Sequence, residues 1–227
     1  MNLAVFDLDG TLTRTNEVDD QCFVQAFADA LGIHELNRNW SEYEHVTDLG
    51  CLQQAFRTKF HRPITISETS KFIECFVDLL RKRQIRDSAS FQQIAGAASM
   101  LVRLKEGSGW TVAIATGCWQ RSAQFKIEVA GIPAEGLPAA FADDGPSRES
   151  IVRTAIDRAG TGFERIVSIG DADWDVRTAR RLGLPFIGIG GSRRAERLRL
   201  AGAGHTMENF LDQNGFIRAL EEAVMPS

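Results

Sequence analysis

Short apolar runs that end in Gly, Asp or Thr recur along the chain, and patterns typical of amphipathic helices separate the later runs from one another. Such runs are typical of strands buried on both faces of a parallel sheet, where a helix connects one strand to the next. The sequence therefore predicts an α/β fold built on a doubly wound, Rossmann-like parallel sheet. We expect strands at 3–6, 111–115, 166–169 and 186–189, a weaker strand at 137–142, and helices at 97–105, 122–130, 148–159 and 176–182.

Residues 15–86 interrupt this alternation, because they carry three or four amphipathic helical patterns and no convincing strand. The segment begins directly after the first strand and its turn, so we interpret it as a helical domain inserted into the sheet domain. Residues 1–14 and 90–227 are then expected to form the α/β core, and residues 15–89 an all-helical domain.

The charge balance narrows the choice of partners. A net charge of −4 over 227 residues gives no general attraction to nucleic acid or to an anionic membrane. Basic residues gather only locally, and we interpret this group as the solvated face of a helix: Arg193, Arg194, Arg197 and Arg199. We therefore expect no nucleic acid and no membrane as a partner, and the oligomeric state stays open.

The cysteines and the first residues of the chain bear on its compartment. The four cysteines are widely spaced and form no C-x-x-C pair, which favours a reducing environment. Asp7 and Asp9 interrupt the early apolar run, so we expect no signal peptide, and no apolar stretch reaches the roughly 20 residues that span a bilayer. The sequence thus predicts a cytoplasmic location.

Acidic residues follow two of the predicted strands at their carboxyl ends, where ligands bind in doubly wound sheets. Asp7 and Asp9 follow the first strand, and Asp171, Asp173 and Asp175 follow the strand at 166–169. Unpaired carboxylates at the edge of a hydrophobic core are costly, and a bound cation would offset that cost. Mg²⁺ prefers carboxylates, water and phosphate oxygens as ligands. We interpret Asp173 as a turn or helix-cap residue and the other acids as functional.

The strand at 111–115 ends in Thr116-Gly117. A hydroxyl and backbone amides at the start of the following helix suit a phosphate oxygen, helped by the positive end of that helix. By itself this signal is weak, because Thr at a helix start is more often only a cap.

Together these residues resemble the motifs of the haloacid dehalogenase-like hydrolase superfamily, chiefly its phosphatases with a helical cap, such as the phosphoglycolate phosphatases. The segment Asp7-Leu8-Asp9-Gly10-Thr11 resembles the first motif of this family, and Thr116 resembles the second. Gly170-Asp171, together with Asp175, resembles the fourth. The resemblance implies that residues 15–89 form the cap. It also implies a magnesium-dependent phosphatase that hydrolyses a small phosphorylated metabolite through an aspartyl phosphate.

The resemblance further implies a role for each of these residues. Asp7 would be the nucleophile, and Asp9 would protonate the leaving oxygen and later activate water. Mg²⁺ would be held by Asp7, the backbone carbonyl of Asp9, and Asp171, with Asp175 orienting these ligands. Thr116, with the backbone of Gly117, would hold the transferring phosphoryl group.

One position departs from the family. The third motif usually supplies a lysine, but residues 143–149 contain none and offer Arg148 instead. Arg148 would neutralise Asp7 and the phosphate with a planar fork rather than a point charge. The other candidate, Lys126, lies on the helix after Thr116. We favour Arg148 and expect substitution of Lys126 to change turnover little.

Substrate choice in capped members of the family depends on the cap, and residues 45–50 are the candidate specificity loop. Thr47 and Asp48 in this loop are candidate substrate-binding residues, although either is equally well explained as a helix cap.

Related activities fit less well than simple hydrolysis. Asp9 separates phosphoryl transfer from dehalogenation, the first lysine (Lys59) comes too late for a phosphonatase, and the first histidine (His34) too late for a typical phosphomutase. Two alternatives nevertheless stay open: a related phosphomutase, and a non-catalytic phosphometabolite-binding member of the fold.

Overall fold

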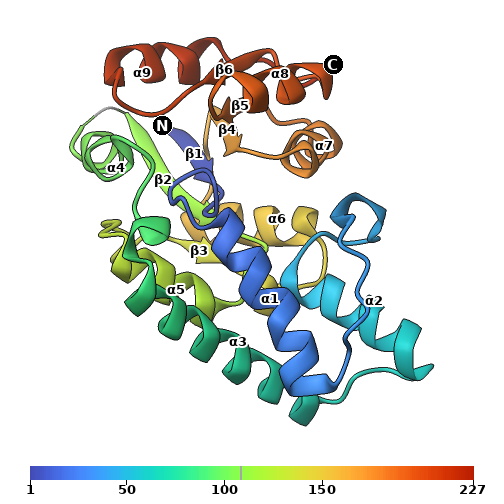
Figure 1. Cartoon of the computed structure of the whole chain (residues 1–227). Coiled ribbons are helices and arrows are strands. Elements are labelled where there is room, and N and C mark those ends of the chain that lie inside the picture. The colour runs from blue at the N-terminus through green and yellow to red at the C-terminus, as the bar shows by residue number, and fades with distance from the viewer. Residues whose placement is uncertain (108) are drawn as a thin grey trace.

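The computed structural model describes residues 1–107 and 109–227. Within them, six parallel strands form one sheet in the order β3-β2-β1-β4-β5-β6 (Figure 1). The strands span Asn2–Phe6 (β1), Trp110–Ala115 (β2), Ala139–Ala140 (β3), Arg165–Gly170 (β4), Phe186–Ile189 (β5) and His205–Met207 (β6). The predicted α/β fold with a doubly wound parallel sheet is confirmed.

The register of the central strands sets the position of the acids. Phe6 of β1 lies opposite Ile114 of β2 and Ile169 of β4. The carboxyl ends of these three strands therefore meet at one edge of the sheet. Residues that follow them directly, such as Asp7 and Asp171, are brought together although far apart in sequence.

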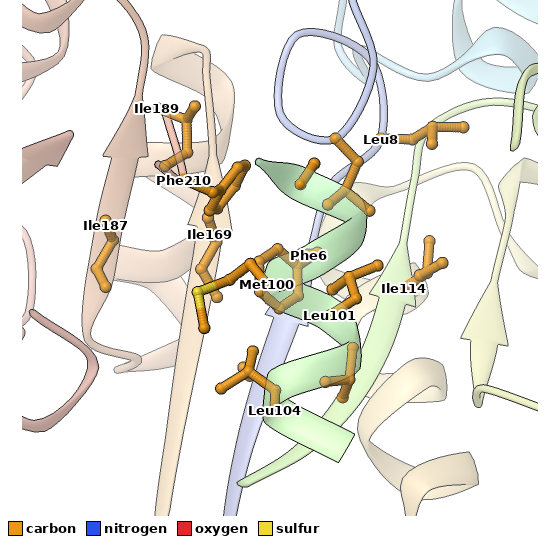
Figure 2. Close-up of a cluster of buried hydrophobic side chains, with 14 of the residues drawn as sticks. Phe6, Leu8, Met100, Leu101, Leu104, Ile114, Ile169, Ile187, Ile189 and Phe210 are labelled. Atoms are coloured by element: carbon orange, nitrogen blue, oxygen red, sulfur yellow. The ribbon is translucent and has the colours of Figure 1, made fainter. Parts of the chain in front are cut away.

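Helices cover both faces of the sheet. They span Ala97–Lys105 (α4), Gln120–Val129 (α5), Arg148–Ala159 (α6), Asp173–Leu182 (α7), Ser192–Leu200 (α8) and Gln213–Glu222 (α9). Because side chains alternate along a strand, Phe6 joins the core on the α4 and α9 face, while Val5 joins the core on the α6 face. Figure 2 shows Phe6 against Met100 and Leu101 of α4.

Three helices form the inserted segment: α1 (Asn16–Leu31), α2 (Asp48–Phe60) and α3 (Ile66–Arg86), which Figure 1 shows grouped away from α9. Their core is aromatic, and Trp119, which follows β2, packs into it with ring centroids 5.6 Å from Phe72 and 6.3 Å from Phe76. The chain leaves and re-enters the core side by side, since the Arg14 amide donates to the Gln92 carbonyl at 2.8 Å. The inserted helices are therefore joined to the core by two linker segments that hydrogen-bond to each other, and the Trp119 ring of the core packs among them.

Two elements of the sheet differ from the sequence expectation. The weak strand expected at 137–142 shortens to β3, because Pro138 precedes it and a 3-10 helix begins at Ala142. Strand β6 was not predicted, since its three residues are half-buried and mostly polar. Across the residues described, no helix has both the length and the hydropathy needed to cross a membrane.

Candidate active site

Three buried carboxylates meet at the carboxyl ends of β1 and β4. Side-chain oxygens of Asp7, Asp171 and Asp175 all lie within 4.8 Å of one another, and the residues are 8%, 3% and 5% exposed. The first turn of α7 holds this arrangement, since Asp175 Oδ2 accepts from the backbone amides of Asp171 at 3.2 Å and Ala172 at 3.1 Å. Asp7 of the first motif and the two acids of the fourth motif thus form one cluster.

The negative charge of these three carboxylates is only partly neutralised by the arginines that contact them. Burial, reinforced by Asp175, raises the pKa of Asp7 well above its usual value, even though Arg148 opposes the shift. Burial also raises the pKa of Asp171 to about 7, against the lowering effect of Arg194. A site of closely spaced, buried carboxylate oxygens fits a hard divalent cation such as Mg²⁺, whose charge would stabilise the ionised forms.

Arg148 lies against this cluster from the start of α6. Its Nη1 is 2.7 Å from Asp175 Oδ1 and 3.5 Å from Asp7 Oδ1, and its Nε donates to the Val46 carbonyl at 2.8 Å. Its guanidinium carbon lies 5.6 Å from the centre of the Trp174 ring. Arg148 is therefore the cation beside the predicted nucleophile, in the position where the family resemblance led us to look for one.

Lys126 lies beside Asp9 instead. Its ammonium is fully buried and contacts Asp9 Oδ2 at 2.6 Å, Asp19 Oδ1 at 2.6 Å and Cys118 Sγ at 3.0 Å. A direct role in substrate binding stays a prediction for Lys126. The expectation that substitution of Lys126 would change turnover little stays a prediction, and the enclosure of this side chain between two carboxylates is a reason to expect a larger effect.

The Asp9 carboxylate belongs to a second cluster, with Asp19 and Cys118. Thr15, Cys118 and Lys126 all donate to it. Burial alone would raise the pKa of Asp9, but Lys126 and these hydrogen bonds outweigh it, so the pKa is lowered. The Asp9 side chain is thus not among the clustered oxygens of Asp7, and its predicted part in metal binding, through the backbone carbonyl, stays a prediction.

Thr116 and Gly117 lie at the end of β2, beside Asp7 and facing the cap. Thr116 is 1% exposed, and its Oγ1 accepts weakly from the Cys118 amide at 3.3 Å. A Cβ on Gly117 would lie 3.0 Å from Arg148 Nη2 and 3.3 Å from Thr47 Cα. The glycine therefore permits the close approach of the cap loop to the active site.

In the loop at residues 45–50, Thr47 and Asp48 both begin helix α2 and lie at the active site. Thr47 caps α2 by accepting from the Gly50 amide at 3.0 Å, and its hydroxyl also donates to the Pro146 carbonyl at 2.7 Å. The Asp48 amide donates to the Gly117 carbonyl at 2.8 Å, and Asp48 Oδ2 accepts from the Trp119 amide at 3.0 Å. Both residues thus start a helix and fasten the cap to the loops around Asp7.

A cavity of about 410 Å³ lies between cap and core, and every acid of the two clusters except Asp175 lines it. The core side contributes Asp7, Thr116 and Arg148, and the cap side contributes Asp48, Trp40 and Phe23. This volume suits a small molecule that presents one group to Asp7 and the rest of its surface to the cap.

Arg194 is a site residue that the sequence interpretation missed. Its Nη1 lies 2.9 Å from Asp171 Oδ2, and the side chain is 34% exposed, so the expected solvated helix face is wrong at this position. Arg197 also pairs with an acid, Asp173, at 3.0 Å. The sequence did contain a signal for Arg194, because this residue follows the predicted strand at 186–189. That strand, β5, is the neighbour of β4 in the sheet, so its carboxyl end lies at the same edge as Asp171.

The family model described as haloacid dehalogenase-like hydrolase matches residues 1–183. The chain belongs to the haloacid dehalogenase-like hydrolases. All the site residues predicted from sequence lie within the matched range, whereas Arg194 lies outside it.

Several known proteins resemble this haloacid dehalogenase-like hydrolase over most of both chains. The probable phosphatase IndB of Dickeya dadantii is 25% identical over 224 residues, which cover 96% of this chain and 94% of that protein. A hydrolase from Pseudomonas syringae has a similar structure, with a TM-score of 0.74 at 22% identity, covering 98% and 100% of the two chains. The structure of a putative β-phosphoglucomutase from Bacteroides vulgatus is also similar, with a TM-score of 0.69 at 16% identity. The match covers 99% of this chain and 90% of that one.

Proposed function

We propose that this hydrolase is a Mg²⁺-dependent phosphatase that cleaves a small phosphomonoester through a phosphoryl intermediate on Asp7. The observation that carries the proposal is the position of Asp7. Its carboxylate lies at the wall of the cavity, within a cluster of carboxylates that fits a divalent cation and beside the Arg148 guanidinium. A carboxylate nucleophile needs such positive surroundings, because phosphoryl transfer brings several negative charges together.

Asp7, Asp171 and the backbone carbonyl of Asp9 are the groups that would hold Mg²⁺, and Asp175 would orient them. When bound, the ion would supply positive charge to the phosphate oxygens. In the first step an Asp7 oxygen bonds to phosphorus, the ester P–O bond breaks, and Asp9 gives a proton to the leaving oxygen. In the second step Asp9 takes a proton from water, the water oxygen bonds to phosphorus, and the bond between Asp7 and phosphorus breaks. Inorganic phosphate and the free alcohol are the products.

Asp9 has the surroundings that this exchange of roles requires. Its lowered pKa favours the ionised form, which accepts the proton from water in the second step. A phosphate group next to it would add negative charge and raise that pKa, which favours the protonated form for the first step.

A related phosphomutase is the second candidate, because a putative β-phosphoglucomutase is among the similar structures. A mutase of that kind must turn a bisphosphate over in the cavity, so the cap would have to receive a second phosphate. The cap contributes Glu17, Asp19, Asp20 and Asp48 to the cavity, and burial together with Asp19 already raises the pKa of Asp48. A further anion against this wall is unfavourable, which supports hydrolysis of a monophosphate.

The test is phosphate release from a panel of phosphometabolites, measured with Mg²⁺ and with a chelator, for wild type and for Asp7→Asn. A matched control is Asp157→Asn, at an exposed acid of α6 that is remote from the cluster. We expect Mg²⁺-dependent release by wild type and the control, and none by Asp7→Asn. Release from no substrate by the folded wild type would leave a non-catalytic binding role, and conversion of a sugar phosphate to its isomer without phosphate release would favour the mutase.

We also propose a cytoplasmic setting for this reaction. All four cysteines are free thiols in the structure, and three of them are buried, as a reducing compartment allows.

A further inference from the structure

Lys126 joins the core to the cap at a point that the catalytic scheme does not explain. It extends from α5 of the core, where no part of its side chain is exposed, and its ammonium lies between Asp9 of the core and Asp19 of cap helix α1. Burial of an ammonium is costly unless it is paired and hydrogen-bonded. Here the two carboxylates and the Cys118 sulfur occupy the three donor positions of the ammonium.

The contacts of Asp9 explain what this arrangement fixes. Asp9 Oδ2 receives hydrogen bonds from Lys126 and Cys118, while Oδ1 receives one from Thr15. Two of these donors depend on the cap, because Thr15 is the N-cap residue of α1 and Lys126 is held by Asp19 in the first turn of α1. The orientation of the Asp9 carboxylate therefore depends on where α1 sits relative to the core.

We infer that Lys126 is the positioning residue of Asp9 and that Asp19 couples this positioning to the seating of the cap. The inference rests on the proposed function, because Asp9 matters for its two proton transfers. Arg148, beside the nucleophile, then performs the task expected of the third-motif lysine, and Lys126 performs a separate one, because it holds the proton carrier. Asp9 would then keep this orientation only while Asp19 of α1 stays seated against Lys126.

The experiment compares two substrates that differ in their need for a proton on the leaving oxygen. A 2,4-dinitrophenyl phosphate loses its leaving group without protonation, whereas an alkyl phosphate needs the proton from Asp9. The quantity measured is kcat/KM, which reports phosphoryl transfer to Asp7, and the variants are Lys126→Met and Asp19→Asn. Matched controls are Glu128→Gln on α5 and Asp29→Asn on α1, at exposed acids of the same helices.

For Lys126→Met we expect the ratio of alkyl to dinitrophenyl kcat/KM to fall about 100-fold, within the range of general acid catalysis. For Asp19→Asn we expect a fall of about 10-fold, because Lys126 keeps its contact with Asp9. Release of dinitrophenol should also show a burst in Lys126→Met, since the second step loses its positioned base. The control variants should keep the wild-type ratio.

A purely structural role would lower kcat/KM equally for both substrates, and that result overturns the inference, as does an unchanged ratio in Asp19→Asn. The Asp19→Asn result decides the question if Lys126→Met does not fold. Failure of the proposed function is distinguishable from these outcomes, because wild type would then hydrolyse neither substrate.

Discussion

Replacement of Arg148 by alanine removes a cation that contacts both Asp7 and Asp175. The guanidinium lies 3.5 Å from Asp7 and 2.7 Å from Asp175, and its side chain is 17% exposed, so water screens it only partly. Removal of one preorganised donor from a site of developing charge typically costs about 100-fold in turnover, or roughly 2.7 kcal/mol. We therefore expect Arg148→Ala to lower kcat at saturating Mg²⁺ by about 100-fold or more.

Stability should fall as well, because Asp175 would keep its two backbone hydrogen bonds but lose its cation. Breaking a buried ion pair costs about 3–5 kcal/mol, and partial exposure of Arg148 places the expected loss at about 3 kcal/mol. For a chain of this length each kcal/mol lowers the melting temperature by about 2–4 °C. We therefore expect the melting temperature to fall by about 6–12 °C, and circular dichroism at the assay temperature checks that the variant is folded.

Two further variants separate charge from geometry. Arg148→Lys should recover part of the turnover, since an ammonium can reach Asp175 but cannot also hold the Val46 carbonyl. Arg181→Ala is the matched control, because Arg181 is 68% exposed and pairs at 2.7 Å with Glu149, next to Arg148 in sequence. Wild-type turnover in folded Arg148→Ala would refute the assignment of this role to Arg148.

Three other predictions test the surroundings of the cluster. Asp171→Asn should raise the Mg²⁺ concentration for half-maximal activity by roughly 10-fold or more, since a hard cation loses an anionic ligand; an unchanged titration contradicts it. Arg194→Gln should lower the Mg²⁺ concentration that gives half-maximal thermal stabilisation, by up to about fivefold, because the competing pair with Asp171 is lost; a higher requirement would refute that competition. Gly117→Ala should destabilise by about 1–3 kcal/mol in denaturant melts, since its Cβ crowds Thr47 and Arg148; an unchanged midpoint would show that the loop adapts.

The positions of the acids that directly follow a strand could be predicted from the sequence. Asp7 and Asp171 follow apolar runs that are recognisable as buried strands, and parallel strands in one sheet must end at a common edge. Their proximity is therefore a consequence of local patterns plus a simple topological rule. The position of Arg148 followed in the same way, because it begins the helix after the third strand of that edge.

The contacts that depend on packing between domains could not be predicted. Lys126 reaches Asp19 only because α1 and α5 both pack against α3, near the aromatic side chains around Trp119, and no local pattern fixes that packing. The pair of Arg194 with Asp171 similarly depends on how α8 is placed after β5. A run of arginines on a helix is usually a solvated face, so composition alone pointed to the wrong environment for this one.

The most direct test of the account is whether a phosphoryl group is found on Asp7 during turnover. Wild type and Asp7→Asn would be mixed with substrate and Mg²⁺, quenched in acid, digested and mapped by mass spectrometry, with hydroxylamine used to identify an acyl phosphate. We predict a hydroxylamine-sensitive phosphate on the peptide that contains Asp7 in wild type, and none in Asp7→Asn. Steady phosphate release by wild type with no phosphate on that peptide, or by Asp7→Asn at the wild-type rate, would contradict the claim that Asp7 is the nucleophile.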